Sequence, residues 1–244
     1  MQKTIFSSIL KSKALRKKQF AVLIDPDKFE SSNAIEISET GGVDFIFVGG
    51  SILTNGNFEE CITSLKKKTK IPIIIFPGNN LQISKNADGI LLLSLISGRN
   101  PELLIGKQVI AAPILKASNL DILPTGYILI DGGKPTAVSY MSNTNPIPFD
   151  KDDIAMCTAM AGEMLGLKLI YMDAGSGALN AISEKMIKKV SSNISIPLII
   201  GGGINTPQKA ILACKAGADI IVVGNAIEKD SSLIKKIGKA VHSI

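Results

Sequence analysis

The sequence predicts an α/β fold, a modified (β/α)8 TIM barrel whose third helix is missing or reduced. Eight short apolar segments recur along the 244 residues, and amphipathic segments separate most of them. The eight segments are apolar throughout, as expected for parallel strands that are covered on both faces. Eight strand–helix units in about 220 residues match the size of such a barrel.

Turn residues bound each of the eight expected strands. In chain order these strands are FAVLID (20–25), FIFVGG (45–50), PIIIFPG (72–78), GILLLSLIS (89–97), TGYILID (125–131), LKLIYMDAG (167–175), PLIIGGG (197–203) and DIIVVGN (219–225). The helical periodicity between them is clearest in SSNAIEISETG (31–41), NFEECITSLKKK (57–68) and TPQKAILACKAGA (206–218).

Two connections depart from the regular pattern. Only ten residues separate Gly78 from Gly89, whereas a parallel crossover usually needs a dozen or more. This is why we expect the third helix to be missing. Residues 132–149 form a long insertion rich in Gly, Pro and Asn after the fifth strand. Because it follows the carboxyl end of a strand, we expect a lid over the barrel mouth. No shift in composition suggests a boundary, so residues 1–244 are expected to form a single domain.

The amino-acid composition and the spacing of the cysteines indicate what class of protein this is. Hydrophobic residues make up 45% of the chain and charged residues 20%, which suits a large core. Cys61, Cys157 and Cys214 show no C-x-x-C spacing, which argues against zinc or disulfides and for a reducing compartment. No signal peptide is recognisable, and no segment reaches the roughly 20 apolar residues of a membrane span. We therefore expect a cytoplasmic protein.

The formal net charge is +6, and basic residues cluster at 11–18, 65–68 and 185–189. These clusters are either solvated helix faces or a patch for phosphate-rich ligands or an anionic membrane surface, which would imply peripheral membrane association. Without tryptophan, with three tyrosines and with no recognisable binding motif, no nucleic-acid partner is expected.

The functional residues of such barrels lie at the carboxyl ends of the strands. The seventh and eighth strands end in IGGGI and VVGN, and a helix is expected to begin near Thr206 and Pro207. Glycines let backbone N–H groups approach an anion, and a helix N-terminus adds a favourable dipole. These ends predict a phosphate cradle, with tight strand-to-helix packing as the alternative.

The first strand ends in IDPDK, and two interpretations of Asp25 remain open from the residues alone. The carboxylate can cap a turn, or it can hold a hard metal ion such as Mg²⁺. Ser51 can offer a neutral oxygen to the same ion or cap a following helix. His242, the only histidine, is expected at a frayed C-terminal end. Acid–base chemistry must then come from carboxylates, tyrosine, lysine or the substrate.

Taken in series, the strand ends resemble one family. LIDPDK, VGGS, FPGN, GYILIDGGKPTAVSYMSNTNPIP, YMDAGSGA, IGGGI and VVGNAIE are similar to the geranylgeranylglyceryl phosphate synthase family, over about residues 20–230. The combination of G-Y-I-L-I with Y-M-S-N-T-x-P-I-P is the most specific part. This combination of motifs is similar to that of the longer branch of the family, which includes archaeal and some bacterial members.

The resemblance implies a Mg²⁺-dependent prenyltransferase that joins sn-glycerol 1-phosphate to a polyprenyl diphosphate, such as geranylgeranyl diphosphate, and releases pyrophosphate. It implies Asp25 and Ser51 as magnesium ligands, and Asp173 and Tyr171 as catalytic residues. The implied glycerol phosphate contacts are Tyr171, Met172, Asp173, Ala174, Gly175, Ser176, Gly177, Gly202, Gly203, Gly224 and Asn225.

One position departs from the family pattern. The family commonly has glutamate where this sequence has Asp173. The aspartate carboxylate reaches about 1.3 Å less, given bond lengths near 1.5 Å. Either the backbone compensates, or the rate or the glycerol phosphate preference differs.

Two other functions are considered. One is an isomerase or aldolase for a sugar phosphate; a Schiff-base aldolase needs a lysine inside the barrel, and only Lys168, at the start of the sixth strand, comes near. The other is a catalytically silent barrel that binds a phospholipid head group, which a turnover assay distinguishes. Exposed apolar helix faces would suit a homo-oligomer, and the depth of an apolar groove would set the prenyl chain length.

Overall fold

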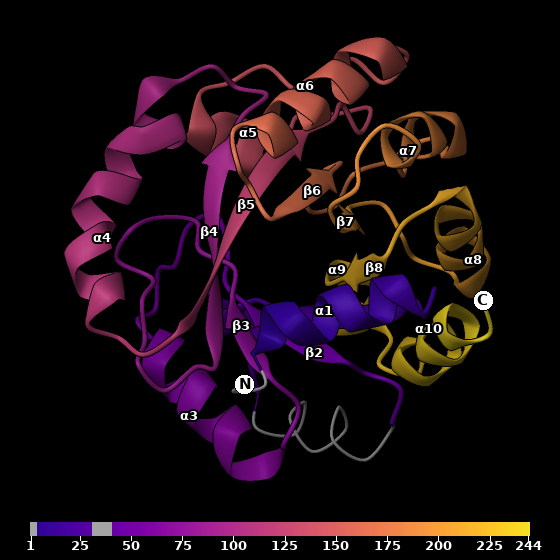
Figure 1. Cartoon of the computed structure of the whole chain (residues 1–244). Helices are drawn as coiled ribbons and strands as arrows, with labels where there is room; N and C mark the ends of the chain where they lie inside the picture. The colour runs from indigo at the N-terminus through magenta and orange to yellow at the C-terminus, as the bar shows by residue number, and fades with distance from the viewer. Residues whose placement is uncertain (1–3, 31–40) are drawn as a thin grey trace.

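The protein folds into a closed barrel of parallel strands. The computed structural model describes residues 4–30 and 41–244, and in them eight strands pair in chain order around the ring (Figure 1). The predicted barrel is confirmed. The strands are β1 (Gln19–Ile24), β2 (Phe45–Val48), β3 (Ile73–Ile75), β4 (Gly89–Leu95), β5 (Asp121–Leu129), β6 (Leu169–Asp173), β7 (Leu198–Gly201) and β8 (Ile220–Val223).

Helices cover the outside of the ring, with α4 on one side of Figure 1 and α8 and α10 on the other. The described helices are α1 (Ile5–Ala14), η1 (Pro26–Lys28), α3 (Phe58–Lys68), η2 (Glu102–Gly106), α4 (Lys107–Lys116), α5 (Ala137–Ser142), α6 (Asp152–Met164), α7 (Glu184–Ser191), α8 (Pro207–Ala216), α9 (Asn225–Lys229) and α10 (Leu233–His242). The helices predicted at 57–68 and 206–218 are confirmed. The segment predicted at 31–41 lies, except for its last residue, outside the described residues.

The helix predicted to be missing after the third strand is absent, because residues 76–88 contain no helix. The buried side chain of Gln82 holds this connection instead. Its Oε1 accepts a hydrogen bond of 3.0 Å from Gly78 N, and its Nε2 donates one of 3.0 Å to Gly50 O. A Cβ atom on Gly78 would lie 2.1 Å from Gly50 O, so the loops after β2 and β3 interlock only because this residue is glycine.

The fifth strand begins at Asp121, four residues before the predicted start at Thr125. The difference arises at Pro124, since proline usually argues against a central strand. Here β6 begins opposite Thr125, so Pro124 has no partner on the β6 side, although it pairs with Leu92 of β4 on the other side. Its carbonyl still accepts a hydrogen bond of 2.9 Å from Lys168 N.

Three aspartates occupy equivalent positions at the amino-terminal end of the barrel. Each of three aspartates directly precedes an even-numbered strand and accepts the hydrogen bond of a backbone N–H at the start of the strand before it. The pairs are Asp44 with Phe20 N at 2.8 Å, Asp88 with Ile73 N at 2.8 Å, and Asp219 with Leu198 N at 2.9 Å. These bonds between a carboxylate and a backbone N–H tie neighbouring strands together at the end of the barrel opposite the one where such barrels place their functional residues.

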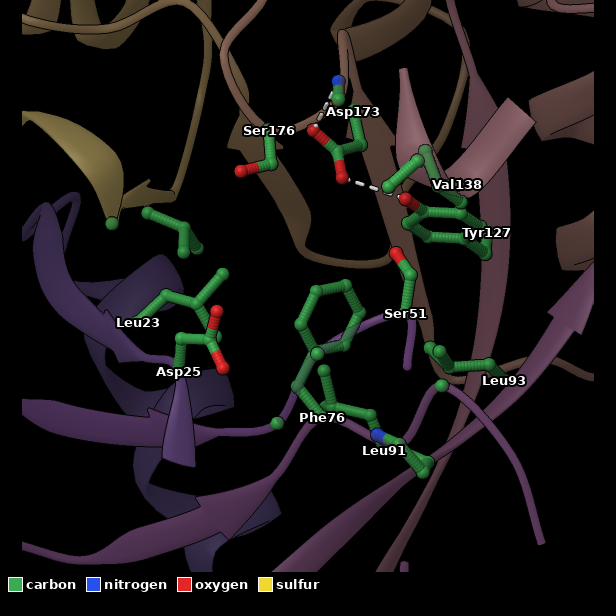
Figure 2. A pocket seen from close by; sticks show the side chains of 18 of the residues that line it. Leu23, Asp25, Ser51, Phe76, Leu91, Leu93, Tyr127, Val138, Asp173 and Ser176 are labelled. Carbon is green, nitrogen blue, oxygen red and sulfur yellow. Dashed lines mark hydrogen bonds between the residues drawn. The ribbon is translucent and has the colours of Figure 1, made fainter. Parts of the chain in front are cut away.

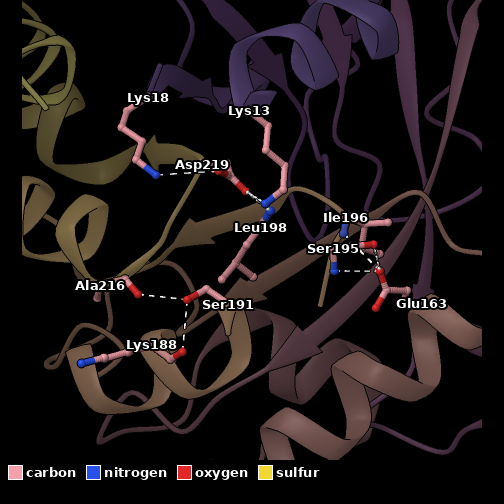
Figure 3. A network of polar contacts seen from close by, with 10 residues as sticks. All are labelled: Lys13, Lys18, Glu163, Lys188, Ser191, Ser195, Ile196, Leu198, Ala216 and Asp219. Carbon is pink, nitrogen blue, oxygen red and sulfur yellow. Dashed lines mark hydrogen bonds and ion pairs between the residues drawn. The ribbon is translucent and has the colours of Figure 1, made fainter. Parts of the chain in front are cut away.

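Helix α1, which was not among the predicted elements, lies across this end of the ring (Figure 1). Ile9 is buried within the barrel-interior cluster. Lys13 Nζ lies 2.7 Å from Asp219 and Lys18 Nζ lies 3.7 Å from it, as Figure 3 shows. The prediction of a frayed His242 is wrong, because this residue ends α10 and its Nε2 lies 2.8 Å from Asp44 Oδ2.

Two surface features bear on the predicted partners. The basic clusters lie on or beside α1, α3 and α7, and each contributes an ion pair, for example Lys66 with Asp88 and Lys185 with Asp152, both at 2.7 Å. The outward face of η2 and α4 is apolar, since Ile105, Val109, Ile110 and Ile114 are all more than half exposed. In the part of the chain that the structure describes, no helix combines the length and apolar composition needed to cross a bilayer.

Candidate active site

A cavity of about 760 Å³ opens at the carboxyl end of the barrel. Loops from all parts of the ring line it, together with α4 and α5. The structure brings most of the predicted site residues to this one cavity (Figure 2). Those that line it are Asp25, Ser51, Tyr171, Asp173, Gly175, Ser176, Gly177, Gly202, Gly203, Gly224 and Asn225.

The side chains of Met172 and Ala174 do not line the cavity, so the predicted contact of these two residues with the substrate stays a prediction that only their backbone can fulfil. Successive side chains of a strand point to opposite faces of the sheet. Tyr171 points into the barrel, so Met172 packs against the helices outside and is fully buried there. The Ala174 side chain is also in this outer layer, and its N–H donates a 3.1 Å bond to Gly201 O.

Asp173 ends β6 with both carboxylate oxygens engaged. Oδ2 accepts a hydrogen bond of 2.6 Å from the Tyr127 hydroxyl, and Oδ1 accepts one of 2.7 Å from Gly175 N (Figure 2). Burial raises the pKa of Asp173 above its ordinary value, while the bonds from Tyr127 and Gly175 work in the opposite direction. The side chain therefore combines a fixed orientation with a greater affinity for a proton than an exposed aspartate has.

Three aromatic rings form the floor of the cavity beside Asp173. Tyr171 stacks on Phe76, with ring centroids 5.1 Å apart, and meets Tyr127 edge-on at 5.5 Å. Burial, followed by the charge of Asp173, raises the pKa of both tyrosines well above the ordinary value. Tyr171 and Tyr127 thus stay protonated at neutral pH, so they can donate hydrogen bonds but do not serve as bases.

The glycine turns after β6 and β7 pack against each other. Gly202 and Gly203 have φ values of +78° and +70°, which glycine adopts readily. A Cβ atom on Gly202 would lie 2.7 Å from Ala174 N and from Asp173 Oδ1. Close packing of one turn on another, and not the strand-to-helix packing considered as the alternative, accounts for the identity of Gly202 and leaves an anion site possible.

The same turns leave backbone donors available. In the described part of the chain, no hydrogen bond engages the N–H groups of Ser176, Gly177, Gly202 and Gly203. The Ser176 hydroxyl donates a 2.7 Å bond to Asn225 Oδ1, which joins the turn after β6 to the one after β8. Open N–H groups on converging glycine turns are an arrangement that suits a phosphate.

Asp25 caps the first turn of η1, because its Oδ1 accepts a bond of 3.1 Å from Asp27 N. Its Oδ2 lies 3.2 Å from Lys28 Nζ, which also lies 3.2 Å from Glu228 on α9. Burial disfavours the ammonium form, but hydrogen bonds to Glu228 and Asp25 outweigh it and raise the pKa of Lys28. Capping, one of the two interpretations of Asp25, is thus confirmed. Ser51 caps no helix, since α3 begins only at Phe58.

The oxygen donors at this end of the cavity fit a magnesium ion. Asp25 offers a partly exposed carboxylate, and Ser51 offers a hydroxyl to the same cavity, with the Phe76 ring between the two side chains in Figure 2. Among the residues that the structure describes, no three acidic, histidine or cysteine side chains gather into a metal cluster. Mg²⁺ is commonly held by one or two carboxylates, with water and substrate phosphates completing its octahedron. One carboxylate and one hydroxyl at a cavity that also offers a phosphate site suit that mode of binding.

The cavity continues away from these polar groups into an apolar channel. Side chains from both faces of β4 line this part of the cavity, together with residues of α4. There the channel occupies space beside the connection that lacks the third helix. The apolar side chains that line it include Ile83, Ile90, Leu91, Leu92, Leu93, Leu103, Ala111 and Leu115.

The insertion 132–149 is more ordered than its composition predicts. It contains α5, whose Val138 and Met141 line the cavity. Its end returns to the barrel, where Ile147 N donates a 2.8 Å bond to Leu129 O. The insertion therefore borders the mouth while remaining fixed to β5 at both ends.

Comparison with known proteins identifies the family. The PcrB family model matches residues 13–241. The chain belongs to the PcrB family. A geranylgeranylglyceryl phosphate synthase from Chitinophaga pinensis is 56% identical over 246 residues, covering 100% of this chain and 98% of that protein. One from Thermococcus kodakarensis is 42% identical over 224 residues, covering 90% of this chain and 88% of the relative.

A solved structure is also similar. The (S)-3-O-geranylgeranylglyceryl phosphate synthase of Thermoplasma acidophilum, crystallised with its substrate sn-glycerol-1-phosphate, superposes with a TM-score of 0.93. It is 33% identical, and the match covers 100% of both chains. The resemblance inferred from the strand ends is thereby confirmed, and PcrB-family membership agrees with the geometry of the cavity.

Three residues of this PcrB-family cavity were not predicted from the sequence. Tyr127 donates a hydrogen bond to Asp173, and Phe76 stacks on Tyr171. Glu228 forms an ion pair with Lys28. Tyr127 could have been found from strand periodicity, because it shares the inward face of β5 with Leu129. Phe76 follows β3 directly and carries no comparable signal.

Proposed function

We propose that this protein joins sn-glycerol 1-phosphate to a polyprenyl diphosphate, releasing pyrophosphate and forming a prenylglyceryl phosphate. Geranylgeranyl diphosphate is the expected donor. One observation carries the proposal: a single cavity connects open glycine turns and Asp173 to an apolar channel. A small phosphorylated polyol and a long hydrocarbon can therefore meet within it. Membership of the PcrB family and the named relatives support the same reaction.

The phosphate of the glycerol substrate is expected at the open N–H groups of Ser176, Gly177, Gly202 and Gly203. Asp173 then faces the hydroxyl groups of the glycerol. The aspartate accepts a hydrogen bond from the attacking hydroxyl and takes its proton as the new C–O bond forms. Because Tyr127 fixes the carboxylate, the hydroxyl is held close to the allylic carbon, which lowers the entropic part of the barrier.

The diphosphate of the prenyl donor is expected at Asp25, Ser51 and Lys28, across the cavity from Asp173. Mg²⁺ bound by Asp25 and Ser51 would neutralise the charge that develops on the leaving group. Lys28 adds a cation from the protein, since it lies at the cavity wall between Asp25 and Glu228. The allylic C–O bond breaks as the ether bond forms, and the electron pair leaves with the pyrophosphate.

We propose that the insertion 132–149 acts as a lid that excludes water from the reacting carbon. Val138 and Met141 support this role, because they present apolar side chains to the cavity. An allylic cation that meets water gives the prenyl alcohol, so excluding water favours transfer over hydrolysis.

We also propose a cytoplasmic homo-oligomer that associates peripherally with membranes. Free Cys61, Cys157 and Cys214 support a reducing compartment. The exposed apolar face of η2 and α4 gives subunits a surface to share. Lysines at both ends of α4 would favour an anionic bilayer over a neutral one. Sedimentation analysis and flotation with vesicles of defined charge test these two properties separately.

The alternative of a Schiff-base aldolase loses Lys168, the candidate that the sequence offered. Lys168 lies just before β6 at the amino-terminal end, where its Nζ is 5.1 Å from the centre of the Phe6 ring on α1. A lysine on that side of the barrel does not reach the cavity.

The test is turnover by the purified protein. Each enantiomer, sn-glycerol 1-phosphate and the 3-phosphate, is incubated with Mg²⁺ and prenyl diphosphates of several lengths, and products are detected by mass spectrometry. We expect product with the 1-phosphate and a preference for one chain length. The absence of product from every pair would refute the proposal and leave the silent head-group binder as the better explanation.

A further inference from the structure

The insertion carries a lysine to the glycine turn that follows β6. Lys134 Nζ lies 3.8 Å from the position that a Cβ atom on Gly177 would occupy, and Asn225 Nδ2 lies 3.6 Å from the same position. An ammonium group and an amide group therefore flank Gly177 from two different loops. Both approach the turn whose N–H groups remain open.

The backbone that carries Lys134 is fixed to this turn. Gly132 O accepts hydrogen bonds from Leu179 N at 3.0 Å and from Asn180 N at 3.1 Å. A Cβ atom on Gly132 would lie 2.6 Å from Ala174 O, so the two segments are in close contact. Gly133 N is bound in turn by Asp131 Oδ1 at 2.9 Å. The position of Lys134 is thus set by local backbone geometry, unlike that of a lysine on an ordinary surface loop.

Lys134 also differs electrostatically from Lys28, one of the lysines that line the cavity. Lys28 forms ion pairs with Asp25 and Glu228, whereas Lys134 forms no ion pair with any residue that the structure describes. An uncompensated cation next to open N–H donors raises the local potential for an anion. Lysine suits a phosphate as a compact point charge on a flexible stem.

We propose that Lys134 is a substrate-binding residue that contacts the phosphate of the glycerol phosphate substrate. The inference rests on the proposed function, and it deepens it by assigning this phosphate a side-chain cation in addition to backbone donors. It also gives the insertion a role in binding the polar substrate, separate from the contact that Val138 makes with the apolar part of the cavity.

The test compares three variants in steady-state kinetics. Lys134→Gln removes the charge, Lys134→Arg keeps it, and Lys188→Gln makes the same change at an exposed position on α7, away from the mouth. For Lys134→Gln we expect KM for sn-glycerol 1-phosphate to rise about tenfold, which corresponds to one charge-assisted hydrogen bond. The kcat and the KM for the prenyl diphosphate should stay within about twofold of wild type. Lys134→Arg should recover most of the loss, and Lys188→Gln should match wild type.

Calorimetric titration of sn-glycerol 1-phosphate into each variant, without prenyl donor, separates this inference from the proposed function. If wild type binds the phosphate about tenfold more tightly than Lys134→Gln but forms no product, the role of Lys134 stands and prenyl transfer fails. If wild type turns over and the two proteins bind and turn over alike, the role of Lys134 is refuted. A rise in KM for the prenyl diphosphate instead would refute it too, as would no binding by wild type.

Discussion

The Tyr127 hydroxyl donates a hydrogen bond of 2.6 Å to Asp173, and the two residues come from neighbouring strands. The register places Tyr127 beside Tyr171 and Leu129 beside Asp173, so the phenol reaches forward along the sheet to the next inward-facing position. Two opposing effects then determine the pKa of the carboxyl group: burial raises it, and the tyrosine bond lowers it. The pair is therefore open to a direct test.

Tyr127→Phe should move the acidic limb of the pH–rate profile to higher pH. The change removes a hydrogen bond that favours the carboxylate, so the pKa of Asp173 rises further and the base is protonated at a higher pH. The measurement is kcat/KM as a function of pH. Tyr140→Phe, the same substitution at an exposed residue of α5, is the matched control. A limb that stays in place would show that the bond does not tune the reacting group.

Asp173→Asn should lower kcat by about 10²- to 10⁴-fold, the usual contribution of a general base. Asp173→Glu retains the carboxylate, so its activity should exceed that of the asparagine variant by at least about tenfold. Asp150→Asn, at an exposed surface carboxylate, serves as the control for the substitution itself. Equal activity of the asparagine and glutamate variants would exclude proton transfer to residue 173.

Asp173 should lower the free energy of unfolding at neutral pH. Its folded-state pKa lies above the unfolded value, because burial disfavours the carboxylate. Such a group contributes most to stability below its unfolded pKa, and that contribution is lost as pH rises through the folded pKa. Asp173→Asn, which is always neutral, should therefore unfold at a higher temperature than wild type near pH 7. The gap should narrow in acid, and a gap of constant size across a pH series of melting curves would contradict this account.

Removal of Mg²⁺ by a chelator should abolish prenyl transfer, and added Mg²⁺ should restore it. Asp25→Asn should reduce kcat at least about a hundredfold, because metal stabilisation of developing charge is worth several kcal/mol. Circular dichroism should show an intact fold, since the cap on η1 needs only an oxygen acceptor. Full activity in chelator, or wild-type rates for Asp25→Asn, would remove this residue from a metal site.

Gly202→Ala should be markedly more destabilising than Gly166→Ala. Both glycines have positive φ, at +78° and +87°, so both substitutions share a strain of about 1–2 kcal/mol. Only Gly202 has backbone atoms 2.7 Å from the added carbon, whereas Gly166 has nothing within 4 Å. Overpacking typically adds about 1–3 kcal/mol. Chemical denaturation measures the difference, and equal losses would show that the close approach relaxes without penalty.

Much of the fold could be predicted because its signals are local. Continuous apolar segments mark buried parallel strands, and a connection of ten residues is too short for a helical crossover. The start of β5 could not be placed, because the rule against proline in a central strand assumes paired strands on both sides, and at Pro124 only the β4 side is paired. Likewise, His242 looked unrestrained because its partner, Asp44, is remote in sequence.

The prediction of the candidate site was most reliable for the glycine turns, where backbone N–H groups and not side chains face the cavity. The glycine turns were found from composition, since few other residues allow such close contact. Met172 is predicted as part of the contiguous contact segment that the family resemblance implies, whereas strand alternation turns its side chain outward. Lys134 was missed because only the pairing of Gly132 with Leu179 and Asn180 brings the insertion to the turn.

The connection that Gln82 holds has a thermodynamic consequence. Where a third helix would have packed its apolar side chains against β4, this barrel leaves a channel lined by Ile83, Ile90 and Leu92. A prenyl chain lying there would occupy part of the missing hydrophobic layer, so the substrate would complete the core that the polypeptide leaves unfinished. Folding and lipid binding are then linked equilibria, and the melting temperature should rise with the concentration of the donor. Detergents with a suitable alkyl chain should stabilise the protein and inhibit it at the same time.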